Sequence, residues 1–287
     1  MSGAWAQHQY GMLFFLFTVT AIAVSNLFAL RRLGKSSCSD RRPLVSILVP
    51  ARNEEGAIEG CITSLLAQDY RPFEVLVLDD ESTDNTPDIL ARLAACHGGL
   101  VPLRGAPLPR GWVGKNWACH QLYLRASGEL LLFTDADTRH EPSALRLAVE
   151  AMKGYQADLL TAFPHEEVRS LGEKLTVPIL TWSTLCFIPL ALAHRMRTPA
   201  LSATVGQFML FERGAYEAVG GHASIKDQVA DDFALGRAIK AAGLRLRLVD
   251  AGEVVSCRMY RGFLPAFRGL SKSLFPAFGH RVLFFLF

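Results

Sequence analysis

The chain has 287 residues, 50% of them hydrophobic, and a mean hydropathy of +0.21, which is high for a soluble protein. This length suits one large α/β domain or two small ones. A formal net charge of only +3 argues against a general nucleic-acid-binding surface. The 6 cysteines show no C-x-x-C pair and no zinc spacing with the histidines, so we expect free thiols in a reducing compartment.

The N-terminal segment is predicted to be a transmembrane helix. Residues 10–30, about 21 in number, carry no charge, and this length is enough to cross a bilayer as a helix. The stretch is too long for the apolar core of a signal peptide, and no small-residue cleavage site follows it. A basic cluster comes next, made of Arg31, Arg32, Lys35, Arg41 and Arg42. We therefore expect residues 1–42 to anchor a domain that faces the cytoplasm.

Alternating strand and helix signals follow, and they predict a parallel sheet with right-handed crossovers. Residues 45–50 and 74–79 are apolar runs typical of buried strands. A helix begins near Ile58, and another near Thr86 and Pro87, which suit an N-cap and a first helical position. Further strands are predicted at 100–103, 158–163 and 245–249, an edge strand at 207–211, and helices near 117–126, 143–152 and 231–243.

The most informative stretch is residues 130–138, Leu-Leu-Leu-Phe-Thr-Asp-Ala-Asp-Thr. Its apolar run predicts a buried strand that places Asp135 and Asp137 at the strand's C-terminal end, where open α/β sheets bind ligands. Two carboxylates at such a short spacing repel each other unless a cation or a proton lies between them. Mg²⁺ or Mn²⁺ is the expected occupant and would share its ligands with substrate phosphates. A lone Asp-x-Asp is more often a turn without a metal, so the choice between the two interpretations depends on the other acidic residues of the chain.

Two more acidic pairs strengthen the interpretation as a ligand site. Residues 79–80 end another strand, and residues 231–232 open a late helix. A diphosphate-linked donor accounts for all three pairs: Asp80 would accept hydrogen bonds from a base, the first pair would hold the metal, and Asp232 would take a proton from an attacking hydroxyl. Each pair alone is more often a helix cap or a solvated turn. Three such pairs in one chain favour the functional interpretation.

Later apolar segments predict contact with the membrane surface. Residues 175–193 are nearly as apolar as the first span, but Pro178, Pro189 and several hydroxyl side chains favour an interfacial or re-entrant helix. A true span is the alternative. Residues 263–278 are aromatic and apolar with interspersed Arg268 and Lys272, which is typical of a helix lying on the membrane. Residues 282–287 are apolar but too short to span, and we expect them to begin a second transmembrane helix whose remainder is missing.

Three ordered stretches resemble inverting family 2 glycosyltransferases of the GT-A fold. They are residues 45–55 (VSILVPARNEE), 74–86 (EVLVLDDESTDNT) and 128–137 (GELLLFTDAD). The similarity covers roughly residues 45–261. Residues 111–115 (Gly-Trp-Val-Gly-Lys) and 258–260 (Arg-Met-Tyr) look most like the membrane-linked subgroup that glycosylates carotenoid and hopanoid-type lipids. The resemblance implies an α/β domain over residues 43–262, with a mostly parallel central sheet flanked by helices, and a membrane-associated segment over 263–287.

The resemblance also implies a role for individual positions. Asp232 would be the catalytic base, and Asp135 and Asp137 would bind the Mg²⁺ or Mn²⁺ cofactor. The donor nucleotide would be contacted by Pro50, Arg52, Glu54, Asp80, Lys115 and Asp135. Acceptor or phosphate contacts are expected from Asp231, Gln207, Arg258 and Lys272. Snorkelling at the membrane surface explains Lys272 equally well.

The implied reaction is the transfer of one sugar from a UDP-sugar to a membrane lipid, by a single in-line displacement at the cytoplasmic face of the cell membrane. The Gln-x-x-Arg-Trp motif of processive polysaccharide synthases is absent, which favours a single addition over polymer growth. Such a synthase, a sugar nucleotidyltransferase and a non-catalytic membrane scaffold are the alternatives. A nucleotidyltransferase would carry a glycine-rich basic loop where residues 51–55 are acidic. The intact set of acids argues against a scaffold.

Overall fold

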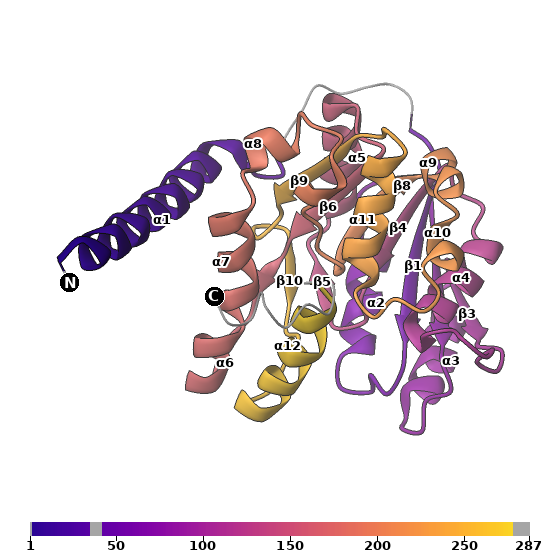
Figure 1. Cartoon of the computed structure of the whole chain (residues 1–287). Helices are drawn as coiled ribbons and strands as arrows, with labels where there is room; N and C mark the ends of the chain where they lie inside the picture. The colour runs from indigo at the N-terminus through magenta and orange to yellow at the C-terminus, as the bar shows by residue number, and fades with distance from the viewer. Residues whose placement is uncertain (1, 35–41, 278–287) are drawn as a thin grey trace.

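The computed structural model describes residues 2–34 and 42–277. A seven-stranded sheet with the strand order β3-β2-β1-β4-β8-β6-β9 forms the centre of the fold (Figure 1). β1 pairs in parallel with β2 and β4, β2 with β3, and β6 with β9. This is the mostly parallel sheet that the sequence predicts. The strands are β1 (Val45–Ala51), β2 (Phe73–Asp79), β3 (Leu100–Arg104), β4 (Leu130–Thr134), β6 (Leu159–Phe163), β8 (Phe208–Glu212) and β9 (Leu246–Asp250).

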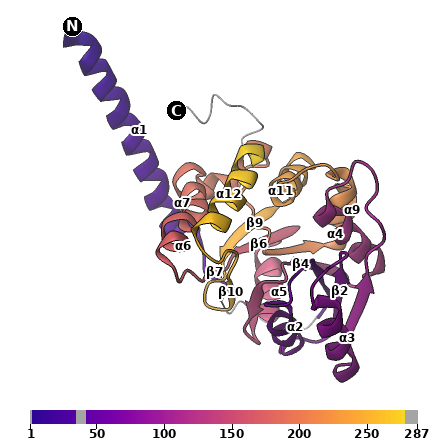
Figure 2. The same cartoon turned by 90° about the horizontal axis from the view of Figure 1, so that it is seen from below.

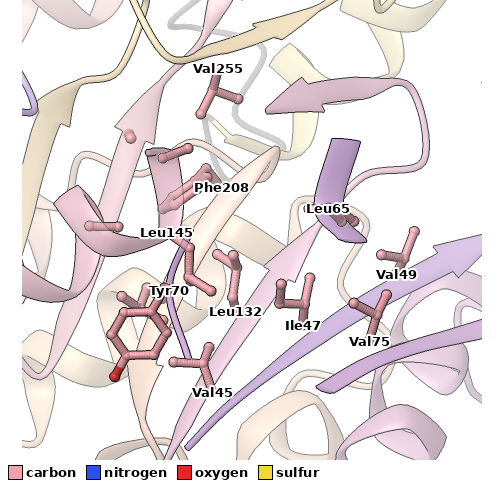
Figure 3. Packing of buried hydrophobic residues seen from close by; sticks show 14 of the residues in the cluster. Val45, Ile47, Val49, Leu65, Tyr70, Val75, Leu132, Leu145, Phe208 and Val255 are labelled. Atoms are coloured by element: carbon pink, nitrogen blue, oxygen red, sulfur yellow. The ribbon is translucent and has the colours of Figure 1, made fainter. Parts of the chain in front are cut away.

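Helices cover both faces of the sheet, as Figure 2 shows. One face carries α2 (Ile58–Leu66), α3 (Thr86–Cys96) and α5 (Ala144–Tyr155), and the other carries α4 (Gly114–Arg125), α9 (Arg213–Ala218), α10 (Gly221–Ser224) and α11 (Asp231–Ala241). Side chains of successive residues in a strand pack on opposite faces of the sheet. Ile47 and Val49 belong to the cluster under α2 and α5, part of which is drawn in Figure 3, whereas Leu48 packs with α4 on the opposite side. Burial on both faces explains why these strands read as continuous apolar runs.

The prediction of an edge strand at residues 207–211 is wrong. β8 lies between β4 and β6 and runs antiparallel to both. Phe208 and Phe211 are fully buried because helices cover both faces of the sheet, and pairing with β4 and β6 provides backbone hydrogen bonds along both edges of the strand. A second difference concerns Thr86, which was expected to cap a helix. Its hydroxyl accepts a hydrogen bond from Glu54 N, and Asn85 takes the N-cap position of α3.

A small three-stranded sheet, in the order β5-β10-β7, was not predicted. Its strands are β5 (Thr138–His140), β7 (His165–Glu166) and β10 (Val255–Cys257). β10 is antiparallel to β5 and parallel to β7. Because β5 follows β4, β7 follows β6 and β10 follows β9, this sheet gathers the chain beyond the ends of three central strands.

The N-terminal helix α1 (Ser2–Ala29) projects away from the domain (Figures 1 and 2). The 25-residue stretch Trp5–Ala29 has a hydropathy of 2.1 and is long and apolar enough to cross a membrane. The C-terminal end of α1 is tied to the domain. Asn26 forms hydrogen bonds with backbone groups from the last turn of α7 to the start of α8, and an isolated β-bridge joins Arg32 to Asp250 at the end of β9.

The apolar segment at 175–193 is divided among α6 (Leu171–Thr176), α7 (Pro178–Phe187) and α8 (Leu190–Ala193), followed by the 3-10 turn Pro199–Leu201. A ten-residue helix such as α7 is about 15 Å long, roughly half the thickness of a bilayer's hydrocarbon core. α12 (Phe263–Ala277) packs beside α6. The five described cysteines are free, as expected. The expectations for Lys35, Arg41, Cys38 and residues 282–287 lie outside the described residues.

Candidate active site

Acidic side chains from three parts of the chain meet at the C-terminal edge of the parallel strands. Asp80 directly follows β2, and Asp135 follows β4. Lys115, from the first turn of α4, connects this edge to the start of α11. Its Nζ lies 2.9 Å from Asp135 Oδ1 and 3.6 Å from Asp231 Oδ2. Asp135 and Asp231, about a hundred positions apart in the chain, therefore both lie beside the Lys115 ammonium group.

Asp80 lies in a narrow, largely buried position beside β1. It is 6% exposed, and Arg52 Nη1 approaches its Oδ2 at 3.5 Å. Burial raises the pKa of Asp80, and the Arg52 guanidinium partly opposes that rise. A Cβ placed on Gly114 would lie 3.2 Å from Asp80 Oδ2, so the glycine lets α4 approach the carboxylate closely. Pro50, near the end of β1, is half-buried.

Hydrogen bonds connect the loop after β1 to the loop after β2. The backbone N–H groups of three consecutive residues donate to side chains of the second loop. These bonds are Asn53 to Ser82 Oγ at 2.9 Å, Glu54 to Thr86 Oγ1 at 2.8 Å and Glu55 to Asp84 Oδ2 at 3.1 Å. In return, Asn53 Oδ1 accepts from Thr83 N at 2.7 Å, with Asn53 in the left-handed region at φ 57°. The network gives Arg52 and Asp80 a rigid support.

Carboxylates crowd around Asp137. Its Oδ1 and the Oε2 of Glu166 are both buried without a hydrogen-bond partner. Burial, followed by the charge of Asp135, raises the pKa of Asp137 to about 6. Burial and the charges of Asp137 and Asp135 raise the pKa of Glu166 to about 7. The same causes raise the pKa of Glu54 to about 7. Such a concentration of unpartnered carboxylate oxygens fits a hard divalent cation.

Within the described ranges, no group of three or more His, Cys, Asp or Glu side chains is arranged to hold a metal ion. A cation at Asp135 and Asp137 would therefore draw further ligands from the substrate or from water, as Mg²⁺ does where it binds through one or two carboxylates plus phosphates. The chemistry of the residues fits the predicted Mg²⁺ or Mn²⁺, but the protein alone does not enclose it.

Asp232 lies in the first turn of α11, next to Asp231. Its Oδ1 accepts a hydrogen bond from Phe233 N at 2.8 Å. Burial, then the neighbouring charge of Asp231, raises the pKa of Asp232 to about 7. A Cβ on Gly206 would lie 3.6 Å from Asp232 Cβ and 3.7 Å from Lys115 Nζ. The absence of a side chain at 206 leaves room beside both groups.

The remaining predicted contacts are distributed differently. Gln207 Nε2 donates to Glu166 Oε1 at 3.3 Å, so Gln207 holds a carboxylate at the acidic cluster. Arg258 Nη2 lies 3.5 Å from Glu173 Oε1 of α6, and its Nε is buried without a partner. Arg258 is thus paired with α6 and not with the acids at the sheet edge. Lys272 lies in α12, where its side chain is outside the described residues.

Sequence reasoning missed two residues near these acids. Glu166 belongs to β7 and follows the predicted strand at 158–163, so its position after a parallel strand was a usable signal. His222 of α10 is 2% exposed, and its Nε2 lies 4.0 Å from Asp231 Oδ2. No pattern in the sequence connects it to Asp231.

A mostly parallel sheet covered by helices on both faces, with acidic side chains at the C-terminal ends of its parallel strands, is typical of nucleotide-sugar transferases with the GT-A fold. The model of the family "Glycosyl transferase family 2" matches residues 46–220. The chain belongs to this family.

Curated relatives share the sequence at a moderate level. The 4,4'-diaponeurosporenoate glycosyltransferase of Staphylococcus aureus (strain USA300) is 28% identical over 234 residues, which cover 80% of this chain and 60% of that protein. The protein of the same description from Staphylococcus haemolyticus is 26% identical over 236 residues. The chain therefore spans about 60% of the length of these relatives.

Solved structures support the fold. A mannosyltransferase from Pyrobaculum calidifontis in complex with GDP-Man and Mn²⁺ has a TM-score of 0.62 at 23% identity, covering 85% of this chain and 65% of that one. Glucosyl-3-phosphoglycerate synthase from Mycobacterium tuberculosis, in complex with Mn²⁺, UDP and glucosyl-3-phosphoglycerate, has a TM-score of 0.54 at 19% identity, covering 91% and 84%. Both confirm the predicted GT-A architecture.

Proposed function

We propose that the protein transfers one sugar from a UDP-sugar to a lipid in the membrane, with inversion at the anomeric carbon. The observation that carries this proposal is the position of Lys115 between Asp135 and Asp231. It joins the acids suited to a diphosphate donor to the helix that carries Asp232. A donor and an acceptor held on the two sides of Lys115 would meet in line.

The donor would lie along the edge formed by β1, β2 and β4. Asp80, oriented by Arg52, would accept hydrogen bonds from the N–H of the base, with Pro50 against the same pocket. Asp135 and Asp137 would hold a divalent ion, with Glu54 nearby. When bound, that ion would offset the charge that develops on the departing diphosphate. The Lys115 ammonium would add positive charge on the same side.

Asp232 would act as the general base toward the acceptor. A carboxylate in water has a pKa near 4 and is a weak base, whereas a group with a pKa near the working pH combines availability with basicity. The pKa of Asp232 at about 7 meets this condition. Because Oδ1 is bonded to Phe233 N, the second oxygen is the one available to take the acceptor proton.

The acceptor is proposed to be a membrane lipid because exposed apolar side chains gather on α7, which packs against α1, and on α6 and α12 next to it. Side chains on neighbouring helices are exposed although they are large and apolar. They include Leu171 and Leu175 of α6, Ile179, Trp182 and Phe187 of α7, and Phe263, Leu264 and Phe267 of α12. Helices with such faces rest in the headgroup region of a bilayer. The segments at 175–193 and 263–277 would then hold the sheet edge beside the lipid headgroups, on the cytoplasmic side.

The test is to incubate membranes containing the full-length protein with Mn²⁺ and labelled UDP-sugars, with GDP-sugars as a parallel arm, and to identify the labelled product. A single-sugar lipid is expected from one UDP-sugar. Asp232→Asn is the matched control, expected to give no product while UDP binding with Mn²⁺ survives. Labelled polymer would support a processive synthase. Exchange of label into nucleotide from a sugar phosphate and UTP would support a nucleotidyltransferase, and no product from any donor would support a scaffold.

A further inference from the structure

A buried tyrosine and histidine lie directly behind the start of α11. Tyr216 of α9 is 1% exposed and His222 of α10 is 2% exposed. The Oη of Tyr216 lies 2.8 Å from His222 Nδ1, and the backbone N–H of His222 donates to the same oxygen at 3.0 Å. The other ring nitrogen of His222, Nε2, faces Asp231 Oδ2 at 4.0 Å.

The hydrogen bonds of Tyr216 select the tautomer of His222. The phenol oxygen already accepts the His222 backbone N–H, so its own hydrogen needs an acceptor, and Nδ1 is the acceptor within reach. Nδ1 is therefore unprotonated and the ring proton is on Nε2, pointing toward Asp231. Burial, despite the opposing charge of Asp231, lowers the pKa of His222 to about 4, so the ring is neutral at pH 7.

Packing holds both rings in place. The ring of Phe133 on β4 lies 4.8 Å from that of His222 and stacks on Tyr216 at 5.3 Å, measured between centroids. A Cβ on Gly221 would lie 2.3 Å from the Tyr216 ring, and Gly221 has a φ of 50°. The glycine is thus required for Tyr216 to reach His222.

We propose that Tyr216 and His222 are positioning residues: the Nε2–H dipole of His222, 4.0 Å from Asp231 Oδ2 and so beyond direct hydrogen-bond length, attracts the Asp231 carboxylate and favours the position in which it keeps Lys115 between the two halves of the site. The chain of contacts runs from Tyr216 through His222 and Asp231 to Lys115, and ends at Asp135. The expected effect of these residues on kcat rests on the proposed function. Groups that orient a ligating or charged side chain in this way commonly affect affinity or activity by about tenfold or more when removed.

The experiment compares His222→Gln with His222→Leu in the full chain. Glutamine can present an N–H near the place of Nε2, whereas leucine fills the space without a donor. We measure kcat with UDP-sugar, and UDP affinity in the presence of Mn²⁺ by calorimetry, together with the melting temperature. We expect His222→Leu to lose on the order of tenfold in kcat and in UDP affinity, with His222→Gln retaining most of both. Tyr216→Phe should give kcat and UDP affinity between those of the two His222 variants. Without the phenol hydrogen, His222 is no longer held in the tautomer that has its proton on Nε2.

Two comparisons make the outcome decisive. Tyr123→Phe is the matched control, since Tyr123 contacts the Tyr216 ring at 4.9 Å but donates its hydroxyl hydrogen bond to the surface residue Glu217; its kcat should be unchanged. In a Lys115→Met background, the difference between the Gln and Leu variants should vanish, as expected for residues acting through one another.

If His222 serves packing alone, the leucine variant will equal or exceed the glutamine variant in kcat, UDP affinity and melting temperature, and the proposal is wrong. The same holds if the difference persists without Lys115. Should the unaltered protein transfer no sugar, the proposed function fails, but the order of UDP affinities among the variants still decides the role of His222.

Discussion

Lys115 Nζ lies 2.9 Å from Asp135 Oδ1, which places an ammonium group on one of the two acids that follow β4. The same ammonium lies 3.6 Å from Asp231 at the start of α11. Burial alone would lower the pKa of Lys115, but the charges of Asp135 and Asp231 raise it well above its usual value. The lysine is therefore charged whenever the site binds a donor, and it reduces the negative potential that a diphosphate would meet.

Replacing this lysine with methionine keeps the length of the side chain and removes its charge. We expect Lys115→Met to weaken UDP binding by about tenfold or more, because a hydrogen bond to a charged group contributes about 1.5–3 kcal/mol. Calorimetric titration with UDP and Mn²⁺ measures the change. Lys226→Met, which alters an exposed lysine on the loop that packs against α4, is the control and should bind UDP normally. Equal affinities in the two variants would remove Lys115 from the donor site.

The pH dependence of transfer follows from Asp232. A base must be ionised to accept a proton, and burial together with Asp231 raises the pKa of Asp232 to about 7. Transfer should therefore be slow below about pH 6 and rise through pH 7 to a plateau, the rise reporting the ionised fraction. Asp232→Asn should give no transfer at any pH. A rate profile of kcat from pH 5.5 to 8.5 tests this, and a flat profile would place the base elsewhere.

Stability should depend on pH and metal through the carboxylates near Asp137. The pKa of Glu166 is raised to about 7, that of Glu54 to about 7 and that of Asp137 to about 6. Between about pH 4.5 and 7 the folded chain retains protons that an unfolded chain has released, so stability falls as pH rises through this window. A divalent cation bound there would replace those protons. We expect Mn²⁺ to raise the melting temperature more at pH 8 than at pH 5.5.

Glu166→Gln tests which carboxylate matters. Removing this charge should raise the melting temperature at pH 8 in EDTA and reduce the further gain from Mn²⁺. The next residue supplies a control: Glu167→Gln alters a surface acid that pairs with Arg169 at 3.0 Å, and it should melt like the unaltered protein. A melting temperature in EDTA that is the same at both pH values would contradict the account of the acidic cluster.

The strands that build the site could be predicted because each is a short apolar run ending in polar residues. β1, β2 and β4 begin and end within one or two residues of their predicted bounds. Once these strands are parallel, their carboxyl ends share an edge, and Asp80 and Asp135 are brought together by topology alone. Local sequence and one rule of sheet construction were sufficient for this part of the fold.

Contacts between distant segments left no comparable signal. The strands of the small sheet have two or three residues, too few for a periodic pattern, so Glu166 was not placed beside Asp137. Sequence identified Lys115 as a charge near the donor but not as the shared partner of two acids. The expected phosphate contact of Arg258 stays a prediction; its pairing with Glu173, which is held in the capping box of α6, could not be predicted from the sequence.

Asn26 provides a test of how α1 is joined to the domain. It is 1% exposed although it lies in an apolar helix. Its Nδ2 donates to the carbonyls of Leu185 at 2.7 Å and Ile188 at 2.8 Å, and its Oδ1 accepts from Leu190 N at 2.8 Å. One amide thus satisfies three backbone groups at the turn between α7 and α8.

Asn26→Leu should loosen this junction without reducing the hydrophobicity of α1. Each buried backbone group left without a partner costs about 1–3 kcal/mol, so three such groups outweigh the apolar contacts that leucine gains. We expect a lower melting temperature in detergent and faster proteolytic cleavage between α1 and β1. Ser25→Ala is the control, because the Ser25 hydroxyl bonds within α1 to the Ile22 carbonyl. If both variants were cleaved at the same rate, the hydrogen bonds of Asn26 would not be what fixes α1 to the α/β domain, and the β-bridge between Arg32 and Asp250 would have to provide the connection.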